Sequence, residues 1–261
     1  MIYLNKAFGV SGISFCIDDG LFEQCYGEIE SIFSTFSCGL DCQYNTKVYV
    51  ISQQFGDGII TTEPVFVYDT DKPTSYFLLA QYVEEIITQF LNCTTLHACL
   101  VRTNNRNTLI VGKRKSGKTT LVLELLKKPD THYIDDDHVF IVGEEYLGLN
   151  MPVFHRNVCD TYYATKLYTV DEEGITREVL IPLNRKEMVN HIDLIIFPEY
   201  SAGCKTSVTR VRGFQLFNRI MENVKNHNNN PDLLNDIVRL SRESSSYAIR
   251  YSEFDWLDSI I

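Results

Sequence analysis

One segment, Gly112 to Thr119, constrains the fold of this chain more than any other. It reads Gly-Lys-Arg-Lys-Ser-Gly-Lys-Thr, a complete G-x-x-x-x-G-K-[ST] pattern. A short apolar and β-branched run, Thr108 to Val111, precedes it, and Thr119 to Lys128 follows with the composition of a helix. Strand, glycine-rich loop and helix, in that order, are the setting in which this pattern binds nucleotide phosphates. The segment therefore predicts an α/β fold with a phosphate-binding loop (P-loop) after a buried strand.

Each residue type in this loop has a physical role. Glycines let the backbone curl tightly, so that successive N–H groups and the helix N-terminus face the phosphates. Lys118 is expected to reach the β- and γ-phosphates, and Thr119 to bind Mg²⁺ through its hydroxyl. We therefore expect ATP and Mg²⁺ as cofactors. The predicted nucleotide-binding residues are Gly112, Lys113, Arg114, Lys115, Ser116, Gly117, Lys118, Thr119 and Thr120.

Three consecutive carboxylates form the second informative segment. Asp135, Asp136 and Asp137 interrupt an extended apolar stretch that resumes at His138–Val142. Acidic side chains in such a context are expected at functional sites. Beside a P-loop, one carboxylate can hold Mg²⁺ and another can accept the proton of an attacking hydroxyl. Strand alternation predicts that Asp136 points to one side and the other two aspartates to the opposite side. An acidic surface turn is the alternative interpretation.

The order of His97, the P-loop and the aspartate pair resembles the catalytic domain of the HPr kinase/phosphorylase family. His97 lies fifteen residues before Gly112, and alternating apolar residues follow Asp136-Asp137. Ile192 to Gly203 looks like the late core strand and turn of the smaller relatives, and the resemblance covers roughly residues 95 to 261. It implies an α/β fold with a P-loop-containing mixed β-sheet core of the HPr kinase and phosphoenolpyruvate carboxykinase type.

The resemblance also implies an activity, the ATP-dependent transfer of the γ-phosphoryl group to a hydroxyl, typically a serine of a protein or peptide. Lys118 and Thr119 match the P-loop lysine and the Mg²⁺-binding hydroxyl. Asp136 matches the base that takes the proton of the acceptor, and Asp137 matches the aspartate nearer the metal. His97 matches an active-site histidine that orients the acidic group, although a lone histidine in an apolar stretch is also typical of a core position. The implied catalytic residues are Asp136, His97 and Lys118, and the implied metal ligands are Thr119 and Asp137.

The chain departs from the family pattern in two places. A Gly- and Arg-rich signature tied to the reverse, phosphorylase reaction is missing between Val142 and Val189, so we expect the forward kinase reaction. Lys113, Arg114 and Lys115 stand where the family has small or acidic residues. These cations would either strengthen binding of a polyphosphate or acidic acceptor, or form a solvated basic rim. A small-molecule hydroxyl kinase and a nucleotide-binding regulator without turnover remain as alternative functions.

Composition bears on partners and compartment. With 261 residues, 44% of them hydrophobic, the chain can bury a sizeable core, and its net charge of −10 argues against nucleic acid as a partner. No stretch is apolar for the length of a membrane span, and the N-terminus lacks a signal-peptide pattern. We therefore expect a nucleotide and a protein or peptide acceptor as partners, no membrane, and eight reduced cysteines in the cytoplasm. Cys38 and Cys42 lack the second pair that a Zn²⁺ site requires.

Residues 1–92 are of a different kind. Val48–Ile51, Ile59–Ile60 and Val65–Tyr68 read as short strands between turns, and Tyr76–Leu91 has helical spacing. We therefore predict two domains: a small β-rich N-terminal unit with a connecting helix over residues 1–92, and the P-loop catalytic domain over residues 93–261. The first unit is expected to recognise the acceptor, to associate copies of the chain into a homo-oligomer, or to cover an edge of the catalytic sheet.

Further elements are predicted in the second half of the chain. Lys166–Val170 and Arg177–Ile181 read as the strands of a hairpin around Asp171–Gly174. Gly213–Asn226 has the spacing of an amphipathic helix, and Tyr247–Tyr251 reads as a last strand.

Overall fold

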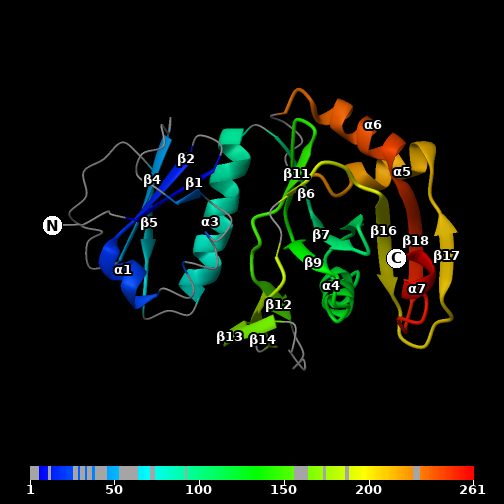
Figure 1. The fold of residues 1–261 in the computed structure, drawn as a ribbon, viewed down its shortest axis with the longest axis horizontal. Helices are drawn as coiled ribbons and strands as arrows, with labels where there is room; N and C mark the ends of the chain where they lie inside the picture. The colour runs from blue at the N-terminus through cyan, green and yellow to red at the C-terminus, as the bar shows by residue number, and fades with distance from the viewer. Residues whose placement is uncertain are drawn as a thin grey trace. The chain divides into compact units, whose positions relative to one another are not determined.

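The computed structural model describes residues 6–10, 13–25, 29, 33, 37–38, 46–52, 64–70, 74–91, 93–155, 164–172, 175–185, 188–225 and 230–261. The chain divides into two compact units. The first is Met1–Leu91 with Val170–Glu172, and the second is Asn92–Thr169 with Glu173–Ile261. The fold is mixed α/β with several sheets, whose elements are labelled in Figure 1. In the described part of the chain, no helix combines the length and the apolar character needed to cross a membrane.

The first unit is built on a five-stranded sheet in the order β3-β1-β2-β4-β5. Its strands are β1 (Lys6–Val10), β2 (Ile13–Ile17), β3 (Ser37–Cys38), β4 (Thr46–Ser52) and β5 (Val65–Tyr68), and its helices include α1 (Asp19–Gln24) and α3 (Thr74–Leu91). Two of the predicted strands are confirmed as β4 and β5, and the predicted helix is confirmed as α3. The strand predicted at residues 59–60 lies outside the described residues. A ring contact of 5.1 Å between Phe66 and Tyr82 joins α3 to the sheet.

The second unit contains a six-stranded sheet in the order β17-β18-β16-β8-β7-β9. The strands are β7 (Ala98–Thr103), β8 (Arg106–Val111), β9 (His132–Asp135), β16 (Leu194–Tyr200), β17 (Ser207–Arg210) and β18 (Ser245–Tyr251). β16 is parallel to both β8 and β18, and β7 is antiparallel to both β8 and β9. Four strands, β8, β9, β16 and β18, therefore run in one direction, and their carboxyl ends lie at one edge of the sheet.

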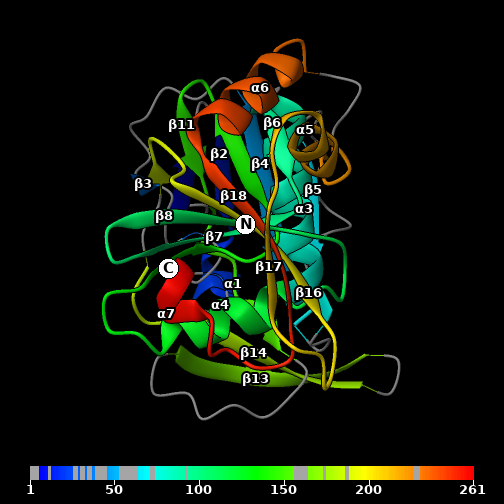
Figure 2. The same cartoon turned by 90° about the vertical axis from the view of Figure 1, so that its right-hand side faces the viewer.

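Helices cover both faces of this sheet. Alternate residues of β8 enter different apolar clusters: Leu109 packs with α5 (Gly213–Met221) and α6 (Leu233–Glu243), whereas Ile110 packs with α4 (Lys118–Leu126) and α7 (Leu257–Ile260). In Figure 2, α5 and α6 lie toward the top of the view and α4 and α7 toward the bottom, with β7 and β8 between them. Strands buried on both faces read as continuous apolar runs, which explains the sequence of β8 and β16.

Two smaller sheets complete the second unit, except that Val170–Glu172 of β13 belong to the first unit. One has the order β15-β11-β10-β6, with β6 (Thr94–Leu96), β10 (Val139–Val142), β11 (Glu145–Leu147) and β15 (Met188–Val189). The other has the order β12-β14-β13, with β12 (Val153–His155), β13 (Ala164–Glu172) and β14 (Ile175–Pro182). The predicted hairpin strands are confirmed as the neighbours β13 and β14, while residues 173–174 of its turn lie outside the described residues.

Candidate functional site

The predicted site residues gather where the four co-directional strands end. β8 ends at Val111 and leads into Gly112, β9 ends at Asp135, and β16 and β18 end at Tyr200 and Tyr251. Ligands of α/β sheets bind in the crevice outside the carboxyl ends of the strands. Direct bonds tie the loop to this edge, because the Tyr200 N–H donates to the Ser116 carbonyl at 3.1 Å and the Tyr251 hydroxyl donates to the Gly117 carbonyl at 3.3 Å.

The loop from Gly112 to Gly117 is a tight curl that requires its glycines. Gly117 has a φ of +98°, in the left-handed region that glycine adopts without strain. A Cβ atom at Gly117 would lie 2.6 Å from the Tyr251 hydroxyl, and one at Gly112 would lie 2.6 Å from Ser116 Oγ. Both glycines are therefore needed for the close approach of the loop to its own backbone and to β18.

Hydrogen-bond donors at the start of α4 are open to an anion. Gly117 precedes the helix and supplies no side-chain cap, so the first N–H groups of α4 are left for an external acceptor. Ser116 Oγ is buried and has no hydrogen-bond partner among the described residues. An oxyanion such as a nucleotide phosphate would supply the missing acceptor both for the first N–H groups of α4 and for the Ser116 hydroxyl.

Lys118 is held in the loop by main-chain oxygens. Its side chain is buried, and Nζ donates to the Gly112 carbonyl at 2.9 Å and lies 3.1 Å from His97 Nε2. Within the described residues, no carboxylate forms an ion pair with Nζ. A buried ammonium group without a carboxylate is costly to desolvate, and an anionic ligand would compensate that cost.

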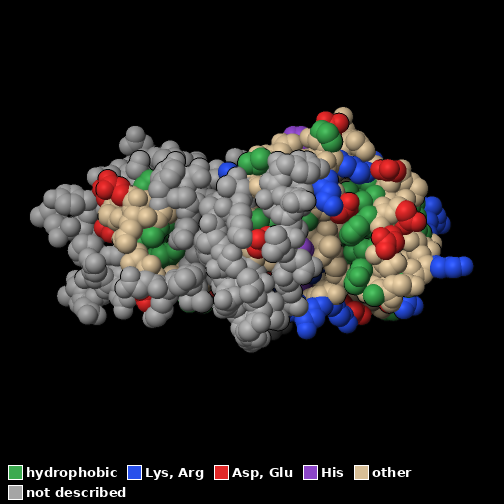
Figure 3. All heavy atoms as spheres, turned by 90° about the horizontal axis from the view of Figure 1, so that it is seen from below, with side chains coloured by type: hydrophobic (Ala, Val, Ile, Leu, Met, Phe, Trp, Pro, Cys, Tyr) green, Lys and Arg blue, Asp and Glu red, His purple; other side chains and the backbone are tan. Residues whose placement is uncertain are grey.

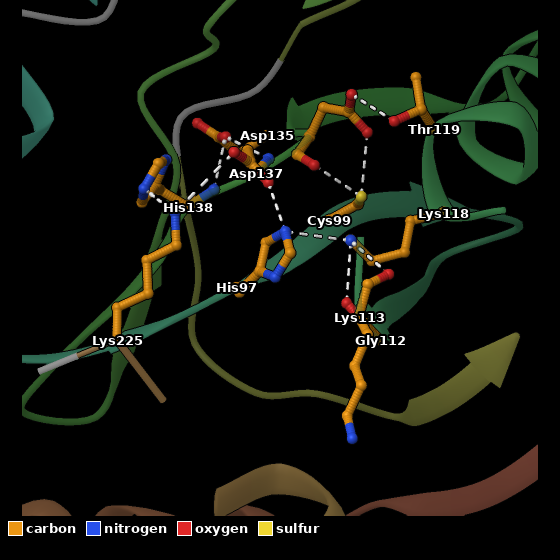
Figure 4. Close-up of polar contacts among 11 residues, drawn as sticks. His97, Cys99, Gly112, Lys113, Lys118, Thr119, Asp135, Asp137, His138 and Lys225 are labelled. Atoms are coloured by element: carbon orange, nitrogen blue, oxygen red, sulfur yellow. Dashed lines mark hydrogen bonds and ion pairs between the residues drawn. The ribbon is translucent and has the colours of Figure 1, made fainter. Parts of the chain in front are cut away.

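His97 faces Asp137 because the chain passes from one sheet to another at His97 and again at residues 136–138. Only His97 separates β6 from β7, and residues 136–138 separate β9 from β10. β6 pairs with β10 in the four-stranded sheet, whereas β7 pairs with β9 in the six-stranded sheet. The two breaks therefore lie opposite each other, and His97 Nε2 lies 2.7 Å from Asp137 Oδ1 (Figure 4).

Asp136 points toward the start of α4. The Thr119 hydroxyl donates to Asp136 Oδ2 at 2.9 Å, and the fully buried Cys99 thiol donates to Oδ1 at 2.9 Å and to the Asp136 carbonyl at 2.8 Å. Burial raises the pKa of Asp136 to about 7 and the neighbouring Asp137 charge acts in the same direction, whereas the bonds from Cys99 and Thr119 oppose the rise. Asp136 is thus a carboxyl group that titrates near neutral pH when no cation is bound.

Asp137 has the opposite electrostatic character. Its side chain is 57% exposed, and Lys225 Nζ lies 3.8 Å from Oδ2. Removal from water acts to raise the pKa of Asp137, but the hydrogen bond with His97 and the charge of Lys225 outweigh it and hold that pKa well below its usual range. Lys225 also contacts His138, whose pKa burial and the Lys225 charge lower to about 4. Asp137 is therefore ionised at neutral pH.

Asp135 organises the bend instead of facing the site. It is fully buried, and its carboxylate accepts the N–H groups of Asp137, His138 and Leu149 at 3.1, 3.2 and 2.7 Å. β9 ends at this residue, and residues 136–137 form a bend. The strand alternation expected for the three aspartates does not apply, because the extended segment stops before Asp136.

The structure brings most predicted site residues together, but not all. Lys118, Thr119, His97 and the aspartate pair are joined by the contacts above. Lys113, Arg114 and Lys115 are exposed, with Lys113 Nζ 3.3 Å from a Glu222 carboxylate oxygen, and Thr120 is exposed on the first turn of α4.

Three residues that were not predicted from the sequence belong to the same edge: Cys99, Tyr200 and Lys225. The sequence signals for Cys99, Tyr200 and Lys225 are weak or absent. Cys99 lies two residues after His97, which is the one local hint of a shared side. Lys225 follows α5 and reaches the site through long-range main-chain contacts, because the Lys225 N–H donates to the Thr95 carbonyl at 2.9 Å and the His97 N–H donates to the Asn223 carbonyl at 2.8 Å.

The donor set fits a hard divalent cation. Among the described residues there is no cluster of three His, Cys, Asp or Glu side chains that could hold a metal by itself. Mg²⁺ in nucleotide sites does not need one, because it binds one or two protein oxygens, substrate phosphates and water. Thr119 Oγ1 and Asp136 Oδ2, 2.9 Å apart, provide two such oxygens beside the loop.

Comparisons with known proteins add little. No protein-family model matches the sequence, and no curated protein matches it. Among solved structures, the chain is similar to the Hpr(Ser) kinase/phosphatase from Coxiella burnetii, with 12% sequence identity, coverage of 61% of this chain and 79% of that chain, and a TM-score of 0.28. The likeness is to the family that the sequence motifs resemble, but at this TM-score it carries no argument about function.

Proposed function

We propose that this protein is an ATP-dependent kinase that transfers the γ-phosphoryl group to a hydroxyl, a serine of a protein or peptide. The observation that carries the proposal is that the Gly112–Thr119 loop and two carboxyl groups of opposite electrostatic character lie at one edge of the sheet. Lys118 Nζ lies 3.1 Å from His97 Nε2, His97 Nε2 lies 2.7 Å from Asp137 Oδ1, and the Thr119 hydroxyl donates to Asp136 Oδ2 at 2.9 Å. Phosphoryl transfer needs this combination of phosphate positioning, cation binding and a proton acceptor.

Mg²⁺ would be held by Thr119 Oγ1 and Asp136, together with phosphate oxygens. Bound there, it would neutralise charge on the phosphate chain. The hydroxyl of Thr119 already contacts Asp136 and not Asp137. This contact favours Asp136 as the carboxylate beside the cation, the reverse of the two roles expected from the family resemblance.

Asp137 and His97 are then the pair that faces the acceptor. In the proposed step, the acceptor oxygen forms a bond with the γ-phosphorus while the bond to the bridging oxygen of ADP breaks. The departing ADP keeps the electron pair of that bond, and the hydroxyl proton passes to Asp137. His97 positions the carboxylate through its 2.7 Å contact. Lys118 would leave the Gly112 carbonyl to bind the phosphates.

Exposure of Asp137 favours a macromolecular acceptor over a small molecule. Its side chain is 57% exposed, so a peptide segment could reach it from solvent, whereas a small-molecule kinase encloses its acceptor in a pocket. The net charge of −10 argues against nucleic acid as the acceptor. Because the proposed reaction consumes ATP, we propose a cytoplasmic location for it.

The test is a two-part assay on the purified chain. Calorimetry with ATP and Mg²⁺ should detect binding, and Lys118→Met should weaken it about ten- to a hundredfold through loss of a charge-assisted contact. Labelled ATP with a lysate or with peptides encoded nearby should then give a phosphorylated hydroxyl that can be mapped. Absence of binding at millimolar ATP would refute the proposal. Binding without transfer to any acceptor would favour a nucleotide-binding regulator.

A further inference from the structure

An exposed aromatic side chain borders the loop on the side away from the carboxylates. Tyr200 is the last residue of β16, whose preceding residues Leu194–Pro198 are buried. Tyr200 is 54% exposed, although its N–H is bonded to the Ser116 carbonyl at 3.1 Å and a Cβ on Gly117 would lie 3.2 Å from the Tyr200 Cβ. Because its main chain is bonded to the loop at Ser116, this exposed ring lies where a ligand bound at the loop can contact it.

Strand order sets the direction in which a nucleotide must lie. In the six-stranded sheet, β7 and β9 lie on one side of β8, and β16 and β18 lie on the other. Asp136 and Asp137 follow β9, so the terminal phosphate must point toward that side for transfer. With the remaining phosphates on the loop after β8, the nucleoside extends toward the ends of β16 and β18, where Tyr200 is exposed.

Tyr200 is supported from behind by a rigid aromatic cluster. Its ring meets the fully buried Tyr251 edge-on, with centroids 5.9 Å apart and an interplanar angle of 71°. Tyr251 in turn packs against Phe254 and Trp256 at 5.3 and 5.6 Å and donates its hydroxyl to the Gly117 carbonyl. A ring fixed in this way loses little conformational entropy when a flat ligand stacks on it.

We propose that Tyr200 forms the subsite that binds the base of the nucleotide by stacking, an inference that rests on the proposed function. Every base presents a π-face, so stacking on a tyrosine tolerates different bases. The ligand class is therefore a nucleoside triphosphate, with ATP and GTP bound similarly.

The experiment compares two Mg²⁺-bound ligands, ATP and inorganic tripolyphosphate, by calorimetry on the full chain. Tyr200→Ala should weaken ATP about five- to a hundredfold, the range of base–aromatic stacking, and leave tripolyphosphate affinity unchanged. Tyr200→Phe should retain ATP affinity. Phe214→Ala, a change at another exposed aromatic residue of the same unit, should affect neither ligand.

The outcomes separate this inference from the proposed function. An equal loss of both ligands in Tyr200→Ala, or no loss of ATP, overturns the stacking subsite while the loop still binds phosphates. Wild-type protein that binds neither tripolyphosphate nor ATP overturns the proposed function and this inference with it.

Discussion

Two adjacent carboxyl groups in this protein have opposite environments. Asp136 is buried against Thr119 and Cys99, whereas Asp137 is exposed and held by His97 and Lys225. Pairs of titratable groups whose surroundings push their pKa values apart are typical of divided catalytic roles. At the scale of single residues, the proposed reaction requires that one of these carboxylates binds the cation and that the other accepts the proton.

Asparagine substitutions should answer that question. Asp136→Asn is expected to raise the Mg²⁺ concentration needed for half-maximal activity, because the oxygen beside Thr119 would lose its charge. Asp137→Asn should bind ATP normally and lose about 10²–10⁴ in the rate of phosphoryl transfer, the range of general-base catalysis. Initial rates over a Mg²⁺ series, with ATP binding by calorimetry, measure both effects. The reverse pattern would restore the assignment made from the sequence.

Burial of Asp136 should also appear in the pH dependence of stability. Its pKa is about 7 in the folded protein against an ordinary 3.8. Between these values the folded protein keeps a proton that the unfolded chain has released, so the free energy of unfolding falls as the pH rises from 3.8 to about 7. Asp136→Asn removes the buried charge and should stabilise the cation-free protein at pH 8 by on the order of 1–4 kcal/mol.

Urea unfolding in EDTA measures the stability that Asp136→Asn adds at pH 8, and this added stability should shrink as the pH is lowered to about 5. Asp137→Asn is the matched control, because it should lower the free energy of unfolding at neutral pH instead of raising it. Because the pKa of Asp137 is lowered, its charged form stabilises the folded state at neutral pH, and that stability is lost as the pH falls below the ordinary aspartate range. An Asp136→Asn variant less stable than wild type at pH 8 would contradict the argument.

At the scale of elements, the loop depends on the backbone of Gly117. Gly117→Ala forces a side chain into a φ of +98° and against the Tyr251 hydroxyl, so we expect loss of ATP binding and about 2 kcal/mol or more of stability. Gly203→Ala is the control, since Gly203 has a φ of +71° and open space where the Cβ would lie. That change should cost only about 1 kcal/mol and leave binding intact. Thermal unfolding and calorimetry test both, and equal effects would refute the steric argument.

Elements with strong local patterns were predictable from the sequence. The helix expected at Thr119–Lys128 is α4, and the strand expected at Tyr247–Tyr251 lies within β18. The helix expected at Gly213–Asn226 is shorter and ends at Met221, because Val224 and Lys225 pair with Leu96 and Thr95 instead. Strands β1 and β2 were missed because each spans only five residues and β1 contains Gly9, a residue type that is depleted in strands.

Within the candidate site, local motifs predicted the residues but not their partners. The P-loop pattern identified Lys118 and Thr119, and the aspartate run identified Asp136 and Asp137. The bend after Asp135 was not predictable, because it depends on the N–H of Leu149, fourteen residues away. Lys225 was not predictable either, since its place beside Asp137 depends on pairing of Val224 with Leu96 across the chain. Contacts between distant segments leave no trace in a local sequence pattern.

At the scale of the whole molecule, acidic residues outnumber basic residues. The chain has 34 acidic and 24 basic residues, and Figure 3 shows acidic and basic side chains interspersed over the described part of one face. A net charge of −10 provides no large basic field for a nucleic-acid backbone.

The two units allow a test by truncation. Both apolar clusters around the six-stranded sheet consist of residues between Leu96 and Ile261. A fragment of residues 93–261 is therefore expected to unfold cooperatively and to bind ATP and Mg²⁺ within about twofold of the full chain, the error expected for independent parts. Lys118→Met in the same fragment is the control that should abolish tight binding.

The acceptor reaction of this fragment then assigns a role to the first unit. If the fragment binds ATP as tightly as the full chain but no longer phosphorylates the acceptor, residues 1–92 carry acceptor recognition. If it does both, that unit serves association or covers the sheet, and sedimentation of the full chain and the fragment distinguishes these two. A fragment that fails to fold while the full chain folds would show that residues 1–92 contribute to the stability of the second unit, contrary to the expectation from the apolar clusters.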